Sequence, residues 1–156
     1  MCSSGFGKIF HGAGMQMTNN GTGVYYKPGI PLNDDLQVLA DIGVHFDNSQ
    51  QSVNIFGFEN KYKSVFFDLS ASIRRELFKE TIAGTFRPVI IVQCGSLADM
   101  NSFDWNDISR NWKIKYAVGT GIQFYNGRIL NEIMLKYNQS SAFEGNMAFQ
   151  LAMYWK

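Results

Sequence analysis

The chain has 156 residues, enough for one domain with a single core. Its 14 basic and 13 acidic residues are scattered and leave a net charge of +1, which excludes the basic tract of a nucleic-acid-binding protein. The 2 cysteines exclude a disulfide framework, and the longest aliphatic run, Val89 to Val92, is far shorter than the roughly 20 residues of a membrane-spanning helix.

Alternation of apolar and polar residues predicts β-strands along the whole chain. Successive side chains of a strand point to opposite faces, so a period of two marks a strand with one apolar face. In chain order the expected strands are 8–18, 22–30, 36–47, 64–74, 82–94, 112–125, 128–138 and 145–156. The first two are less regular and are expected to form a hairpin across Asn19, Asn20 and Gly21. The pattern therefore predicts eight strands and no long helix.

The connections between these strands are expected to alternate between short and long. Residues 31–34, 75–80 and 125–128 predict tight turns or short links, and residues 139–144 a connection of moderate length. Two other connections, 48–62 and 95–111, are long and polar, whereas the first hairpin loop is short. Short turns beside the chain ends and longer loops opposite are typical of outer-membrane barrels.

The composition of the two faces indicates which one points inward. The polar faces are rich in small residues such as Gly43, Ser70, Gly119 and Ala152. An eight-stranded barrel has an interior just wide enough for side chains to fill, so small residues relieve crowding there. We therefore predict that the large apolar side chains face lipid. Representatives of this face are Val38, Ile42, Leu69, Val118, Phe149 and Leu151.

The inward faces also carry ionisable residues. They are Asp41, His45, Asp68, Arg74, Arg87, Lys113, Lys115, Glu132 and Lys136. A buried charge without a partner costs several kcal/mol, so we expect a nearly balanced network that closes the lumen. Asp41, Asp68, Arg87 and Glu132 are expected near mid-height, where they would bridge one another. A path for protons or ions along these charges is the alternative.

No catalytic or metal-binding set stands out in the sequence. His45 shares a strand face with Asp41, but the chain has 2 histidines and no cluster of Cys or Glu for a tetrahedral metal site. Ser70 and Ser72 have no histidine placed beside them as a base. We expect no metal, no cofactor and no enzymatic activity. A lipid-modifying enzyme of the outer membrane is one alternative, and a soluble, lipocalin-like carrier of an apolar ligand is another.

In strand alternation and loop asymmetry, the chain from Lys8 onward resembles the small eight-stranded outer-membrane β-barrels of Gram-negative bacteria, of the OmpA-domain and OmpX kind. Trp155 matches the aromatic residue near the C-terminus that such barrels use in recognition by the assembly machinery, although Lys156 follows it. The resemblance implies an all-β, antiparallel, up-and-down transmembrane barrel over residues 8–156, after an N-terminal segment of residues 1–7. Short turns would be periplasmic and longer loops extracellular.

The resemblance also implies a location in the bacterial outer membrane. Residues 1–7 lack the charged start and apolar core of a signal peptide, so we expect a mature form or a truncated gene product. Cys2 is interpreted as a free thiol, because no lipidation motif precedes it. Cys94 is interpreted as a small hydrophobic residue.

The expected function is a structural or protein-interaction role, either alone or as a small subunit of an envelope complex. Outer-membrane lipid would surround the barrel, and a protein partner would bind through loops 48–63 and 95–111. Exposed large apolar residues are favoured at binding hot spots. The candidates in the second loop are Met100, Phe103, Trp105 and Ile108. The alternative is that these four pack over the mouth of the barrel.

Overall fold

The computed structural model describes residues 9–19, 21–55, 58–77, 86–101, 106, 111–126, 128–141 and 145–155; the side chains of residues 48–63 are not part of this description. The described chain is an antiparallel sheet. Its strands are β1 (His11–Thr18), β2 (Gly21–Tyr26), β3 (Gly29–Pro31), β4 (Leu36–Ile55), β5 (Phe58–Glu76), β6 (Phe86–Asp99), β7 (Trp112–Asn126), β8 (Ile129–Ser140) and β9 (Asn146–Trp155). In the described ranges, no helix is long and apolar enough to cross a membrane.

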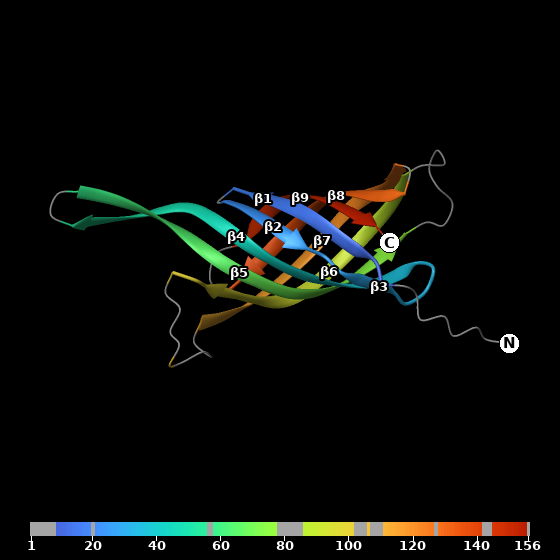
Figure 1. Ribbon diagram of the computed structural model, residues 1–156, viewed down its shortest axis with the longest axis horizontal. Helices are drawn as coiled ribbons and strands as arrows, with labels where there is room; N and C mark the ends of the chain where they lie inside the picture. Colours follow the sequence, from blue (N-terminus) through green and yellow to red (C-terminus); the bar gives the residue numbers. More distant parts are fainter. Residues whose placement is uncertain are drawn as a thin grey trace.

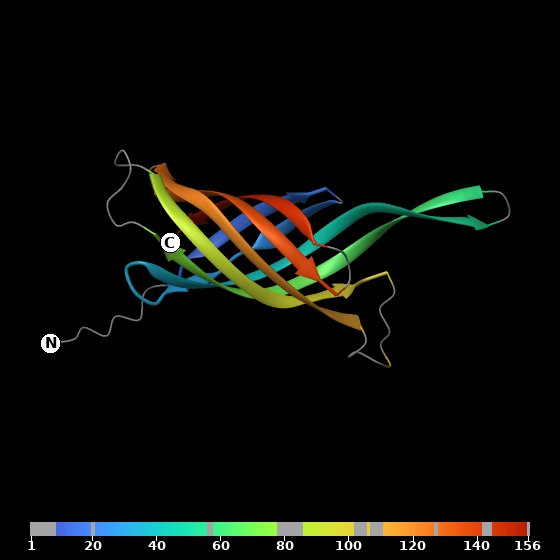
Figure 2. The ribbon, with the colours of Figure 1, turned by 180° about the vertical axis from the view of Figure 1, so that it is seen from behind.

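The sheet closes on itself into a barrel (Figures 1 and 2). Each of β4 to β8 pairs with the next strand along the chain, and β9 pairs with β1. β1 then pairs with β2, and β2 pairs with β4, which closes the ring. Closure satisfies backbone N–H and C=O groups between neighbouring strands and removes the edges of the sheet.

β2 and β3 are two parts of one barrel strand. The pair Tyr26–Ile42 in β2 and the pair Gly29–Leu39 in β3 share one register against β4. The interruption falls at Lys27 and Pro28, because proline has no N–H to donate to the ladder. Lys27 still donates its backbone N–H to Gly12 O at 2.8 Å. The barrel therefore has eight strands, and the segment predicted at 22–30 is this single interrupted strand.

Burial alternates along the strands, so the barrel has distinct inner and outer faces. In β9, Ala148, Gln150, Ala152 and Tyr154 are buried. The intervening residues of β9 are exposed or half-buried. The outer face carries large apolar side chains, as the sequence predicts. Ile42, Leu69, Val118 and Phe149 are exposed on it, and Val38 and Leu151 are half-buried on the same face.

Two small apolar clusters interrupt the otherwise polar interior. One contains Phe10, Leu39, Ala152 and Tyr154, and the other contains Val89, Ile91 and Met134. Glycine makes room for the rings of the first cluster, since a Cβ at Gly12 would overlap Tyr154 and one at Gly29 would overlap Phe10. The first cluster lies toward the barrel end that carries the short turns, here called the turn end.

β4 and β5 extend beyond the rest of the barrel as a two-stranded ribbon, at the left of Figure 1. Along β4, pairing with β2 ends at Asp47, and along β5, pairing with β6 begins at Phe66. Between these points the two strands pair with each other, after a register shift between Asp47 and Gln51. The prediction of a loop at 48–62 was therefore wrong. Its Asn, Ser and Gln residues have low strand propensity, but a long hairpin overrides that local preference.

Other strand ends differ by smaller amounts. β6 continues to Asp99, so the first residues of the predicted loop 95–111 are strand that pairs with both neighbours. The predicted start of this strand, residues 82–85, lies outside the described residues. The barrel end that carries the ribbon and the β6–β7 connection is called the loop end below.

Candidate functional site

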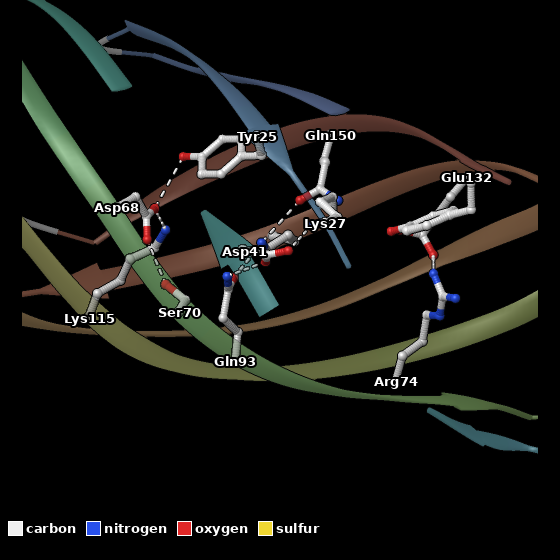
Figure 3. A network of polar contacts seen from close by, with 12 residues as sticks. Tyr25, Lys27, Asp41, Asp68, Ser70, Arg74, Gln93, Lys115, Glu132 and Gln150 are labelled. Atoms are coloured by element: carbon white, nitrogen blue, oxygen red, sulfur yellow. Dashed lines mark hydrogen bonds and ion pairs between the residues drawn. The ribbon is translucent and has the colours of Figure 1, made fainter. Parts of the chain in front are cut away.

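Three ion pairs occupy the lumen and are almost fully excluded from solvent (Figure 3). Lys27 Nζ lies 2.5 Å from Asp41 Oδ1, and Arg74 Nη1 lies 2.6 Å from Glu132 Oε2. Lys115 pairs with Asp68. Strand parity places all these side chains on inner faces, and pairing offsets the desolvation that each charge suffers there.

The Arg74–Glu132 pair lies toward the turn end, apart from the other two in Figure 3. It joins β5 to β8 across the lumen. Gln123 Nε2 donates to Glu132 Oε2 at 2.7 Å, and Tyr154 donates its hydroxyl to Glu132 Oε1 at 3.0 Å. The Arg74 guanidinium also donates to Gln37 Oε1 and lies 4.5 Å from the centre of the Tyr154 ring. Both charged groups are therefore held by several neighbours.

Amide side chains link the pairs into a network at the middle of the barrel. Gln93 Nε2 donates to Asp41 Oδ2 at 2.5 Å, and Gln93 Oε1 accepts from Lys136 Nζ at 2.5 Å. Lys136 also donates to Gln150 Oε1 at 3.1 Å. Gln93 thus connects Lys136 with the Lys27–Asp41 pair, which ties β6, β8 and β9 to β4.

The third pair lies nearer the loop end. Asp68 accepts from Lys115 and from Ser70 Oγ at 2.6 Å, while Tyr25 donates its hydroxyl to it at 3.2 Å. The Tyr25 ring reaches over the inner face of β4, where a Cβ at Gly43 would overlap it. The small residues of the inner faces therefore leave room for large polar side chains, which fill the lumen.

We expect the filled lumen to conduct no steady ion current. Side chains bridge the lumen at three levels, and moving them aside to open a water path would leave buried charges unpaired. The measurement is single-channel recording of the purified protein in planar bilayers. Long, stable open states would contradict the closed lumen.

Seven of the nine predicted lumen residues are buried, and two are not. The buried residues are Asp41, His45, Asp68, Arg74, Lys115, Glu132 and Lys136. Arg87 is instead 36% exposed and pairs with Glu76 at 3.2 Å, and Lys113 is exposed. Each is the second residue of its strand. Strand alternation directs its side chain inward, but at this position the side chain lies beyond the closed part of the barrel. The expected bridge from Arg87 to the lumen carboxylates was therefore wrong.

The sequence reasoning missed Lys27, which supplies the cation for Asp41. The pattern held a usable signal, because Gly21, Gly23, Tyr25 and Lys27 are all buried at alternate positions. The inward role of Tyr154 and Gln150 follows from the same parity in β9. Continuing the alternation two residues beyond Tyr25 would have placed Lys27 on the inner face.

The loop candidates are described only in part. Met100 is 50% exposed, whereas Phe103, Trp105 and Ile108 lie outside the described residues. Within the described ranges, no group of three or more His, Cys, Asp or Glu side chains is placed to hold a metal ion. Cys94 is a free thiol exposed on the outer face.

Comparison with known proteins identifies the fold. No protein-family model matches the sequence, and no curated protein resembles it significantly. Among solved structures, the chain resembles Neisserial surface protein A (TM-score 0.59, 11% identity, 94% of this chain and 92% of that one). It also resembles the de novo designed TMB2.3 (TM-score 0.56, 11% identity, 99% of this chain and 98% of that one). A third similar structure is the N-terminal β-barrel domain of Pseudomonas aeruginosa OprF (TM-score 0.55, 10% identity, 94% of this chain and 96% of that one). The chain therefore has the fold of these small β-barrels.

Proposed function

We propose that the protein is a non-enzymatic barrel of the bacterial outer membrane that binds a protein partner of the envelope through its loop end. The observation that carries the membrane assignment is the distribution of polarity. Large apolar side chains cover the outer face, and charged side chains fill the inside. Exposed apolar side chains on the outer face are unfavourable in water and favourable in contact with lipid hydrocarbon. A soluble monomer rarely exposes so extensive an apolar surface.

The spacing of exposed aromatic residues supports the same assignment. Tyr26, Phe86 and Trp155 are exposed on the outer face near the turn end, and Phe46, Tyr116 and Tyr137 nearer the loop end. On the outer face of β7, Tyr116 and Phe124 are eight residues apart, which is about 26 Å along a strand. With a strand tilt of about 40°, this gives a height of ~20 Å, which fits within the roughly 25 Å apolar band of outer-membrane barrels.

The interior argues against a lipocalin-like carrier. Such a protein needs an apolar cavity at the centre of its barrel and a polar outer surface. Here the centre holds Lys27, Asp41 and Lys136, and the outer surface is apolar. The likeness to a Neisserial surface protein agrees with an envelope location. An enzyme acting on lipid would instead need a nucleophile and a base near the membrane boundary.

The ribbon formed by residues 48–63 supports an interaction role. Along it, the backbone pairing among the described strands joins β4 to β5 alone, and we propose that its outer edges are open to a partner strand. A two-stranded hairpin is marginally stable by itself, and a free strand edge is a template for another chain. Ordering of the ribbon by a partner strand would compensate for its weak local stability.

The register also divides the ribbon into two chemically different faces. Gln51, Val53 and Ile55 lie opposite Tyr62, Asn60 and Phe58, so these six residues share one face. The other face contains the pairs Ser52–Lys61 and Asn54–Glu59. One face is thus rich in apolar residues and the other is polar. We propose that the partner covers the first face and pairs with an adjoining edge.

Site-specific photocrosslinking in intact cells tests this role. A benzophenone side chain at Phe58 or Val53 is expected to crosslink one discrete partner, and the same group at Lys61 or Asn54 much less. Replacing residues 49–62 by Asn-Gly should abolish these partner contacts but preserve heat-modifiable gel migration, because the barrel closes without the ribbon. The matched control replaces residues 100–110 by Asn-Gly and keeps the ribbon.

The outcomes separate the two candidate loops. Crosslinks that persist in the control and are lost without the ribbon support the proposal. Equal crosslinking from both faces, or an unchanged set of co-purified proteins after ribbon replacement, would contradict it. Loss of partners in the control variant would instead assign the interaction to the β6–β7 loop.

A further inference from the structure

An open cavity lies inside the turn end of the barrel and has no part in the proposed interaction. Its volume is about 440 Å³. Phe10, Tyr125 and Tyr154 supply aromatic surface, and Leu130 supplies aliphatic surface. The volume falls within the usual range for small-molecule sites, which combine mostly apolar walls with a few placed polar groups.

Packed side chains close the inner end of the cavity. Phe10 and Tyr154 pack edge to face with ring centres 5.7 Å apart, and both are buried. The Arg74 guanidinium lies beside both rings, 5.7 Å from the Phe10 ring centre and 4.5 Å from that of Tyr154. Its bonds to Gln37 and Glu132 fix its plane. A ligand would therefore enter from the turn side and stop at this floor.

The charge of the lining is asymmetric. Among the described lining residues there are two guanidinium groups, Arg74 and Arg128, and no carboxylate. The charge of Arg74 is compensated by Glu132 behind it, at 2.6 Å. Arg128 lies exposed in the β7–β8 turn, and no ion pair of its side chain is found among the described residues. The cavity thus has apolar walls, a neutralised polar floor and a cation at its mouth.

The geometry points to a binding site for a small amphiphilic carboxylate with an aromatic or short alkyl body. The body fills the space against Leu130, Tyr125 and Tyr154, and the carboxylate accepts hydrogen bonds from the Arg128 guanidinium at the mouth. A planar guanidinium can hold a carboxylate with two parallel hydrogen bonds. The opposite orientation would place the carboxylate near the Arg74–Glu132 pair, where Glu132 repels it.

Nuclear magnetic resonance of the full chain in phosphatidylcholine nanodiscs tests this site. The probes are 3-phenylpropionate, the neutral 3-phenylpropan-1-ol and the cationic 3-phenylpropylamine, which share one apolar body. The signals followed are the Leu130 backbone N–H and the Arg74 Nε–H. The carboxylate is expected to shift both signals saturably, with affinity at least tenfold above that of the alcohol and amine.

Two arginine variants distinguish the site from general partitioning. Arg128→Gln is expected to weaken binding of the carboxylate about tenfold. Arg75→Gln, which removes an exposed arginine of the outer face near the same end, should leave binding unchanged. Equal shifts with all three probes, no effect of Arg128→Gln, or shifts that never saturate would overturn the proposal. Correct folding of each variant is checked by unchanged signals from β7 and β8.

Discussion

Arg74→Gln is expected to destabilise the folded barrel by about 3–5 kcal/mol. The substitution leaves the Glu132 carboxylate buried with neutral partners, Gln123 and Tyr154. Glu132 is 1% exposed, so water cannot replace the lost cation. The reverse change, Glu132→Gln, should cost a similar amount because it leaves Arg74 uncompensated. Equilibrium unfolding in urea with phospholipid vesicles measures both.

The double variant Arg74→Gln/Glu132→Gln gives the sharper result. Because neither charge remains, it should be more stable than either single variant, with a coupling energy above about 2 kcal/mol. The matched control is the pair Arg87–Glu76, whose arginine is 36% exposed. Its variants should change stability by roughly 0–1 kcal/mol, because solvent screens the pair. Additive single effects at Arg74 and Glu132 would contradict the buried network.

Leu151→Arg is the second change with a large expected effect. Leu151 lies near the middle of β9 on the outer face, so the guanidinium would meet hydrocarbon. We expect a loss of about 2–4 kcal/mol in bilayers. Leu32→Arg is the matched control, because Leu32 is 56% exposed in the turn before β4. At the interface the same substitution should cost about 0–1 kcal/mol. Equal effects at the two positions would mean that Leu151 does not face the bilayer core.

The strands were most predictable where alternation is unbroken and a local turn signal confirms their ends. The predicted strands 112–125 and 128–138 correspond to β7, which ends at Asn126, and β8, which begins at Ile129. The outward face was predictable for the same reason, since parity alone assigns it. The ribbon was not predictable in this way, because its polar residues resemble a loop and its pairing depends on the length of the partner strand.

The membership of the lumen network was more predictable than its pairing. Parity places Asp41, Asp68 and Glu132 inside, but it does not say which cation each one meets. Arg74 and Glu132 lie on β5 and β8, which are not neighbours in the sheet. Contacts across a lumen depend on the stagger and tilt of the closed barrel, which local sequence does not encode.

The most direct test of the membrane assignment is the environment of nitroxide spin labels on the outer face. Labels are attached to single cysteines at Val38, Ile42, Leu69, Val118, Phe149 and Leu151, in a Cys2→Ser/Cys94→Ser background, and at Leu32 as the aqueous reference. In phospholipid bilayers, we predict that the six strand labels collide mainly with oxygen, which concentrates in hydrocarbon, and that Leu32 is accessible to a water-soluble nickel complex. If the six labels are as accessible to the nickel complex as Leu32 is, the outer face is in water and the membrane assignment is wrong.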